Sequence, residues 1–106
     1  MITIDQFAEM ELRTGTIVSA ERVPDTDKLL ELRVDIGSEE RTLVAGIAEV
    51  YPAEELAGTT IIVVANLQPA TIRGVLSQGM VLAADVGGRP ILATFKESVP
   101  NGTKVR

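Results

Sequence analysis

The sequence predicts an all-β domain, a small barrel of five or six strands with two short helices. Short apolar or alternating segments recur along the chain, and each ends at a glycine, a proline or an acidic turn. No long helical stretch separates these segments, so parallel βαβ units are not expected. At 106 residues the chain is long enough for one core, and we expect a single domain over residues 1–106.

The N-terminal segment predicts a short helix. Thr3 fits an N-cap, and Gln6 stands three residues later, as in a capping box. The helix is expected to run through Met10. It has an apolar side, made of Ile4, Phe7, Ala8 and Met10, and so short a helix must pack against another surface to be stable.

Residues 11–23 read as one long strand with imperfect alternation. Leu12 and Thr14 share one phase, whereas Ile17 is in the other. Gly15 lies between them and is the predicted site of a β-bulge. A bulge in a long first strand lets a small barrel bend around a corner.

The next segments predict a hairpin. After a turn at Pro24–Asp27, residues 29–37 alternate cleanly, with Leu30, Leu32, Val34 and Ile36 on one face. Residues 40–45 follow a Gly37–Glu39 turn as the partner strand. Residues 48–58 then predict one short helix, because Pro52 suits an early helical position, Glu54 and Glu55 suit the first turn, and Gly58 suits the end.

The stretch from Asn66 to Asp85 organises the rest of the chain. The strand expected before it, residues 59–65, is apolar on both faces and therefore central. The stretch is polar until Met80, and Pro69 marks where the chain leaves the sheet. Strands are expected at 80–85 and 89–95 around a Gly87–Gly88 turn, and residues 103–105 follow a last turn at 100–102.

A family resemblance enters at this stretch. Residues 66–84, NLQPATIRGVLSQGMVLAA, look like the signature of the tRNA-binding domain that follows methionyl-tRNA synthetases and also occurs as small free-standing proteins. Residues 12–37, 41–58 and 99–105 match in order and spacing, so the resemblance covers nearly the whole chain. It implies a five-stranded Greek-key OB-fold barrel, which binds tRNA by shape as an accessory protein or synthetase-associated subunit.

The resemblance also implies the site. Lys28 and Arg73 would meet phosphate, Asn66 would bond a ribose or base, Ser77 would donate a hydrogen bond, and Met80 would pack against a base or sugar. Taken singly, each has an ordinary structural explanation: a solvated lysine or arginine, a strand cap, a turn serine, a core methionine. Together and in register with the family, they favour binding.

The acidic net charge of the chain argues against strong RNA binding. The net charge is −5, but residues 1–55 carry thirteen acids and five bases, whereas residues 56–106 carry two acids and five bases. Relatives tend to have more cations near positions 68–71, where this chain has Gln68, Ala70 and Thr71. Fewer cations imply weaker and less salt-sensitive binding. Only three aromatic residues occur, so a stacking platform for generic single strands is disfavoured.

Other functions find little support. With no histidine or cysteine, the chain lacks the usual general base, nucleophile activator and zinc ligands, so we expect no enzyme activity, no metal site and no cofactor. No leader peptide or membrane-spanning run is recognised, and the expected location is the cytoplasm. The alternative function, from related small proteins, is a secretion-related chaperone that binds unfolded or precursor polypeptides.

The two ends of the chain predict a homodimer. The apolar side of the N-terminal helix and the apolar residues of segment 99–106 would remain after the barrel closes, and free-standing relatives look like dimers of this kind. The alternative is that both ends fold back on their own barrel. An aminoacyl-tRNA synthetase is a further expected partner.

Overall fold

The structure, a computed structural model, describes all residues from Met1 to Arg106. The elements are α1 (Ile4–Ala8), β1 (Leu12–Arg22), β2 (Leu30–Asp35), β3 (Glu40–Ala45), the 3₁₀ helix η1 (Ala53–Glu55), β4 (Thr60–Val64), β5 (Ala70–Ile72), β6 (Val75–Ser77), β7 (Met80–Val81), β8 (Ala83–Val86), β9 (Arg89–Leu92) and β10 (Lys104–Val105). The all-β prediction is confirmed.

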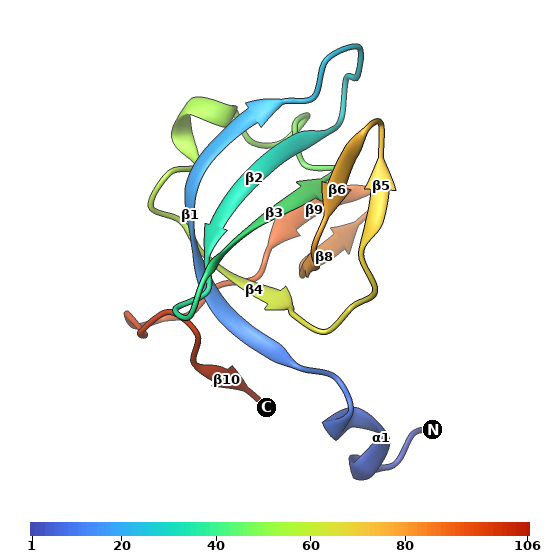
Figure 1. Cartoon of the computed structure of the whole chain (residues 1–106), viewed down its shortest axis with the longest axis vertical. Helices are drawn as coiled ribbons and strands as arrows, with labels where there is room; N and C mark the ends of the chain where they lie inside the picture. The colour runs from blue at the N-terminus through green and yellow to red at the C-terminus, as the bar shows by residue number, and fades with distance from the viewer.

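One antiparallel sheet curves into a nearly closed barrel. Its strand order is β3-β2-β1-β4-β7, and β10 pairs with the start of β1. Figure 1 shows these strands wrapping around one axis, with the hairpins β5–β6 and β8–β9 on one side and α1 projecting beyond the barrel. This arrangement fits the OB-type barrel that the sequence predicts.

The core is aliphatic, as the composition predicts. Every second residue of β2 is buried, and Leu30, Leu32 and Val34 are at most 1% exposed. They pack against residues from β1, β3 and β4, among them Ile17, Leu43, Ile61 and Val63. Burial of a set this large supplies the main driving force for folding.

β1 changes its inward face along its length. Leu12 and Thr14 are buried near its start and Ile17 is buried further on, as the sequence predicts. The predicted bulge at Gly15 is wrong, because Gly15 pairs regularly with Ile61 and the register shifts between Ile17 and Ser19. Gly15 serves close packing instead: a Cβ there would lie 2.8 Å from Val34 Cγ1.

The two helices are shorter than predicted. The capping box of Thr3 and Gln6 is present at α1, but no residue of α1 is buried. In place of the α-helix expected over 48–58 there is one 3₁₀ turn, Ala53–Glu55, for which Pro52 is the extended N-cap. Leu56, directly after the turn, is 2% exposed, so the turn serves to bring one apolar side chain into the core. Neither helix is long and apolar enough to cross a bilayer.

The strand predicted at 80–85 divides into two. β7 closes the main sheet against β4, and β8 leaves it to form a separate hairpin with β9. Gly87 and Gly88 have φ of +60° and +85°, so the predicted turn between β8 and β9 is confirmed. The Tyr51 hydroxyl accepts a hydrogen bond of 3.1 Å from Leu92 N–H and ties this hairpin to the body of the protein.

The C-terminal segment folds onto its own barrel. Val105 lies opposite Leu12, and Lys104 lies opposite Arg13. Thr14 Oγ1 donates to Pro100 O at 2.7 Å and accepts from Thr103 N–H at 2.9 Å. The expectation that this segment is a leftover apolar end is therefore wrong, since pairing with β1 half-buries Val105. Of the two ends, only α1 keeps an unpaired apolar side.

Candidate nucleic-acid interface

The polar stretch from Asn66 to Gly79 contains a hairpin that the sequence did not predict. β5 and β6 pair antiparallel, with Ile72 opposite Val75, and Arg73 and Gly74 form the two-residue turn. Both turn residues have positive φ, +50° for Arg73 and +82° for Gly74. This is the pattern of a type I′ turn, which favours asparagine or glycine at both positions. Arg73 thus stands at the hairpin tip in a conformation that costs an ordinary L-residue about 1 kcal/mol.

Lys28 and Arg73 are brought together. Lys28 lies in the loop between β1 and β2, and that loop and the hairpin tip line one pocket of about 360 Å³. The loop is ordered by Thr26 Oγ1, which donates to Val23 O at 2.8 Å, and by Arg22 Nη1, which donates to Asp27 O at 2.9 Å. Loops at these positions of an OB barrel form the usual binding site for oligonucleotides.

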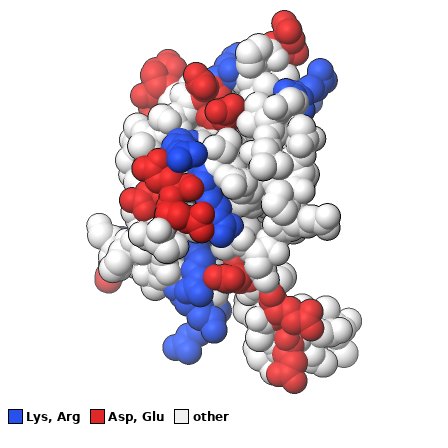
Figure 2. Space-filling model, in the orientation of Figure 1, with Lys and Arg blue, Asp and Glu red and all other residues white.

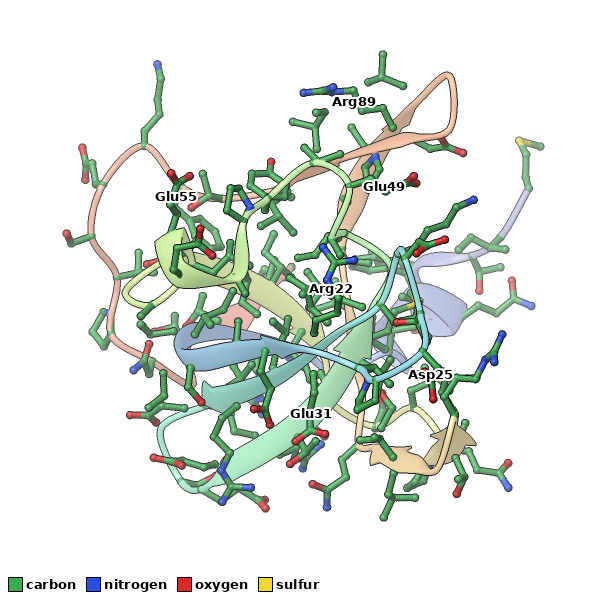
Figure 3. All side chains as sticks on the ribbon, turned by 90° about the horizontal axis from the view of Figure 1, so that it is seen from above. Arg22, Asp25, Glu31, Glu49, Glu55 and Arg89 are labelled. Carbon is green, nitrogen blue, oxygen red and sulfur yellow. The ribbon has the colours of Figure 1, made fainter.

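The same pocket carries acidic side chains, which restrict how an anion can approach. Asp25 and Asp27 line it beside the two cations. Figure 3 views this end of the barrel from above, and acidic side chains, among them Asp25, Glu31 and Glu49, spread around Arg22. These carboxylates weaken the attraction of a phosphate to Lys28 and Arg73, and the side of the hairpin tip, where Arg73 stands, is the more favourable approach to the pocket.

Asn66 and Met80 stand at the other end of the stretch. Asn66 Oδ1 accepts from Glu11 N–H at 2.8 Å, and its Nδ2 donates to Glu9 O at 2.7 Å. The Asn66 side chain thus holds the link between α1 and β1. Met80 is 46% exposed, and it lines an open groove of about 370 Å³ with Met10, Leu67 and Leu82.

The structure places Ser77 inside the protein. Ser77 is 5% exposed, and its hydroxyl accepts from Val44 N–H at 2.9 Å and donates to Gly79 O at 3.1 Å. The predicted hydrogen bond from Ser77 to RNA does not fit this geometry, because the single hydroxyl proton is already used and the group is out of reach. Ser77 belongs to the support of the site.

Two residues that the sequence did not single out fix the stretch to the barrel. Gln78 exchanges bonds with Thr42, from Thr42 N–H to Gln78 Oε1 at 3.1 Å and from Gln78 N–H to Thr42 O at 2.8 Å. Arg41 Nη1 donates to Ala65 O and to Gln78 O. These bonds, with those of Ser77, occupy the free edge of β3, which in an open sheet would be exposed. The sequence offers one signal for this role, because two polar residues stand directly before Gly79.

The visible charge distribution is mixed. In Figure 2 basic side chains run down the face where β2 and β3 lie and on toward β10, with acidic side chains along one flank and more acid on α1. No group of three or more His, Cys, Asp or Glu residues is arranged to hold a metal ion.

Comparison with known proteins gives a consistent result. A family model described as "Putative tRNA binding domain" matches residues 12–104. Methionine–tRNA ligase from Methanosphaerula palustris is 50% identical over 106 residues, which are 100% of this chain and 16% of that protein. The corresponding protein from Methanocorpusculum labreanum is 53% identical over 105 residues, 99% of this chain and 15% of that protein. The chain thus spans about a sixth of the length of these relatives.

Solved structures resemble the fold over its full length. The crystal structure of a MetRS related protein from Pyrococcus horikoshii superposes with a TM-score of 0.94 at 41% identity, covering 100% of this chain and 98% of that one. The crystal structure of chaperone CsaA from Bacillus anthracis str. Ames gives a TM-score of 0.91 at 30% identity, covering 100% and 99%. The likeness therefore extends to proteins named for two different activities.

Proposed function

The chain belongs to the tRNA-binding domain family, and from this premise we propose that it binds tRNA without catalysis, by recognising the shape of the folded RNA. The observation that carries the proposal is the meeting of Lys28 and Arg73 at one pocket, although 45 positions separate them in the sequence. Each cation would contact a phosphate, and the Arg73 guanidinium can do so with two parallel hydrogen bonds.

The strained turn supports this role for Arg73. Asparagine or glycine would suit its positive φ better, so packing and turn geometry do not explain an arginine at the tip. Backbone strain of this kind is often found where function requires a particular side chain. At the tip of a hairpin that Ser77, Gln78 and Arg41 anchor at its base, the guanidinium is presented on a fixed support.

The aromatic residues support recognition by shape. Phe7, Tyr51 and Phe95 are all half-buried and lie in separate parts of the chain, so no row of rings offers bases a surface for stacking. A binder of this composition gains affinity from phosphates and ribose hydroxyls, which a folded RNA presents at fixed positions. Asn66 and Met80 would add a ribose or base contact at the opposite end of the stretch.

We place the protein in the cytoplasm, as a free-standing accessory protein or a subunit associated with a methionyl-tRNA synthetase. The relatives that carry this domain within a much longer chain are named methionine–tRNA ligases. A non-catalytic domain tethered to such an enzyme would keep tRNA near it and raise its effective concentration.

A homodimer is part of the proposal. α1 has no buried residue, and its neighbourhood exposes Ile2, Ile4 and Met10 beside the groove that Leu67 and Met80 line. Two copies joined through this surface would bring two weak tRNA sites together. Met80 borders this surface as well as the RNA site. If Met80→Ala weakens tRNA binding but still sediments as a dimer, Met80 acts at the RNA site; if the dimer is lost, Met80 acts at the interface.

A second candidate function has one observation in its favour. The apolar groove of Met10, Leu67, Met80 and Leu82 would suit an apolar segment of an unfolded polypeptide, and a protein named as a chaperone has the same fold. The intact polar stretch with Arg73 at its tip favours RNA over polypeptide, because an apolar segment makes no use of a guanidinium.

A gel-shift series tests the proposal. Total tRNA, an unstructured RNA of equal length, single-stranded DNA and an unfolded polypeptide are compared as ligands. We expect tRNA to bind most tightly, and Lys28→Ala and Arg73→Ala each to lower affinity and reduce the salt slope by about one unit. Equal binding of tRNA and unstructured RNA would reject recognition by shape, and preference for the polypeptide would favour the chaperone function.

A further inference from the structure

A second group of cations lies at the other end of the barrel, where β1 meets β10. Arg13 and Lys104 are direct cross-strand partners, so their side chains leave the pairing on the same face. Leu12 and Val105, the adjacent pair, turn inward. Like charges directly opposite each other in an antiparallel pair reduce stability. The fold therefore accepts an unfavourable pair at this position.

Two glutamates, Glu11 and Glu39, line the same pocket as Arg13 and Arg41, but each makes only one weak contact with an arginine. Arg13 Nε makes one contact of 3.1 Å with Glu11, and Arg41 Nη2 makes one of 3.4 Å with Glu39. The side chains of both glutamates are about half exposed, and single contacts of this kind contribute less than about 1 kcal/mol. Lys104 makes no salt bridge. A stronger anion can thus displace the glutamates at little cost.

The guanidinium groups are held in place by neutral acceptors. Arg41 donates to Ala65 O and Gln78 O, and Arg13 Nη1 donates to Gly102 O. Both line one polar pocket of about 570 Å³. Ser38 is exposed at the same pocket, and neither its hydroxyl nor its N–H donates a hydrogen bond within the protein.

Two turns are closely packed at the floor of this pocket. A Cβ on Gly102 would overlap Ile36 O, and a Cβ on Gly37 would lie 2.7 Å from Asn101 O. Asn101 Oδ1 accepts from Thr16 Oγ1 at 2.7 Å. Close packing leaves the two turns little room to move against each other, which limits the conformational entropy lost when an anion binds.

From these observations we infer that the pocket of Arg13 and Arg41, with Lys104 beside it, is a second phosphate-binding site, occupied by the backbone of the same RNA that Lys28 and Arg73 contact. The inference rests on the proposed tRNA binding. Figure 1 places β10 and the β5–β6 tip toward opposite ends of the barrel. In Figure 2 the basic side chains run over β2 and β3 toward β10, and uncharged surface separates them from the hairpin tip. One folded RNA lying along this face would contact both groups.

The second site also changes how the low cation count is understood. The stretch from Asn66 to Gly79 carries a single cation, and one or two phosphate contacts give weak binding at physiological salt. Contacts at both ends of the barrel would at least double the number of released counterions. They would also fix the direction of the RNA, because two separated contacts define a line on the protein surface.

The test measures tRNA affinity of the whole chain at several salt concentrations. Lys104→Ala is expected to weaken binding three- to tenfold and to reduce the salt slope by about one unit. Arg13→Gln, which leaves Arg41 and its structural contacts in place, is expected to act in the same direction. Lys96→Ala is the matched control, because Lys96 is an exposed lysine without a salt bridge that does not line this pocket.

A double variant that changes both groups of cations tests whether the same RNA contacts both. If one RNA spans both groups, Lys104→Ala and Arg73→Ala have additive effects on the binding free energy, and the double variant loses about two units of salt slope. The inference would be overturned if the unsubstituted protein binds tRNA but Lys104→Ala and Arg13→Gln bind it as well as Lys96→Ala does. The proposed function would then still stand. Absence of tRNA binding by the unsubstituted protein would overturn the proposed function, and the second site with it.

Discussion

Arg73 shows how one residue can serve binding at a cost in stability. Its φ of +50° lies in the left-handed region, where asparagine is tolerated much better than arginine. We expect Arg73→Asn to raise the free energy of unfolding by roughly 0.5–1 kcal/mol and to weaken tRNA binding. Thermal melting and gel shifts measure the two effects.

Arg89→Asn is the control for that change. Arg89 is an exposed arginine at the start of β9, next to the β8–β9 turn, and its φ is not positive. It should gain no stability and keep its affinity. A loss of stability in Arg73→Asn would show that the arginine makes a structural contribution at the tip.

Ser77 gives a second prediction at this scale. Ser77→Ala removes the acceptor for Val44 N–H and the donor to Gly79 O. An unsatisfied group at a buried position costs about 1–3 kcal/mol, so the melting temperature should fall clearly, whereas Ser98→Ala at an exposed position should leave it unchanged. At a temperature where Ser77→Ala is folded, its tRNA affinity should fall less than that of Arg73→Ala, because Ser77 acts only through the support of the hairpin. A loss as large as that of Arg73→Ala, with the salt slope also reduced, would return Ser77 to the binding surface.

The candidate site was partly predictable because its signals are local. An isolated arginine in a polar stretch between two apolar strands indicates exposure, and Arg73 is exposed. The meeting of Lys28 with Arg73 depends on how two loops pack, which no local pattern encodes. The burial of Ser77 was also hidden, because serine suits an exposed turn as well as a satisfied interior position.

The β5–β6 hairpin is held to the barrel mainly by side chains. Gln78 Oε1 takes the place of a backbone acceptor for Thr42 N–H, so the edge of β3 is paired without a continuous ladder. We expect Gln78→Ala to lower the free energy of local opening of this hairpin by about 1 kcal/mol. Hydrogen exchange of residues 70–77 would measure it, with faster exchange expected there than in β2.

Gln68→Ala is the matched control, since Gln68 is an exposed glutamine of the same stretch that makes no side-chain hydrogen bond. Its exchange rates should match those of the original protein. Equal exchange in the two variants would mean that Ser77 and Arg41 alone hold the hairpin.

Elements with a strong local period were predicted well, and those that depend on packing were not. β2 and β3 have nearly the predicted bounds, because β2 alternates over six residues and glycine ends it. The segment at 48–58 has helical composition, yet it forms only one 3₁₀ turn, with Leu56 in the core and Tyr51 packed against it. The β5–β6 hairpin escaped prediction because its turn is Arg-Gly, whereas Asn-Gly is the usual signal.

At the scale of the whole molecule, α1 is the element without a partner. It has five residues, none of them buried, and a helix of that length is not stable alone in water. Asn66 fixes its connection to β1 through Glu9 and Glu11, so the helix is held at one end while its apolar side faces solvent. Nearby, Ile2 is 68% exposed and Ile4 78%.

The groove next to α1 is complementary to that apolar side. Met10, Leu67, Met80 and Leu82 line it, and together with the exposed Ile2 and Ile4 they form a contiguous apolar surface of the kind that marks interaction sites. In a dimer with two-fold symmetry, α1 of each copy would lie in the groove of the other, and both apolar surfaces would be covered by one contact.

We therefore expect the full chain to sediment as a dimer at micromolar concentration and a variant that begins at Glu11 to sediment as a monomer. The barrel should stay folded in that variant, because its core includes no residue of α1. Val86→Asp, which changes an exposed apolar residue on the β8–β9 hairpin, should leave the dimer intact. A monomeric full chain would reject the dimer, and a dimeric truncation would reject the role given to α1. If the dimer forms, the truncated protein should also bind tRNA more weakly than the full chain, since two linked sites on one RNA bind more tightly than either site alone.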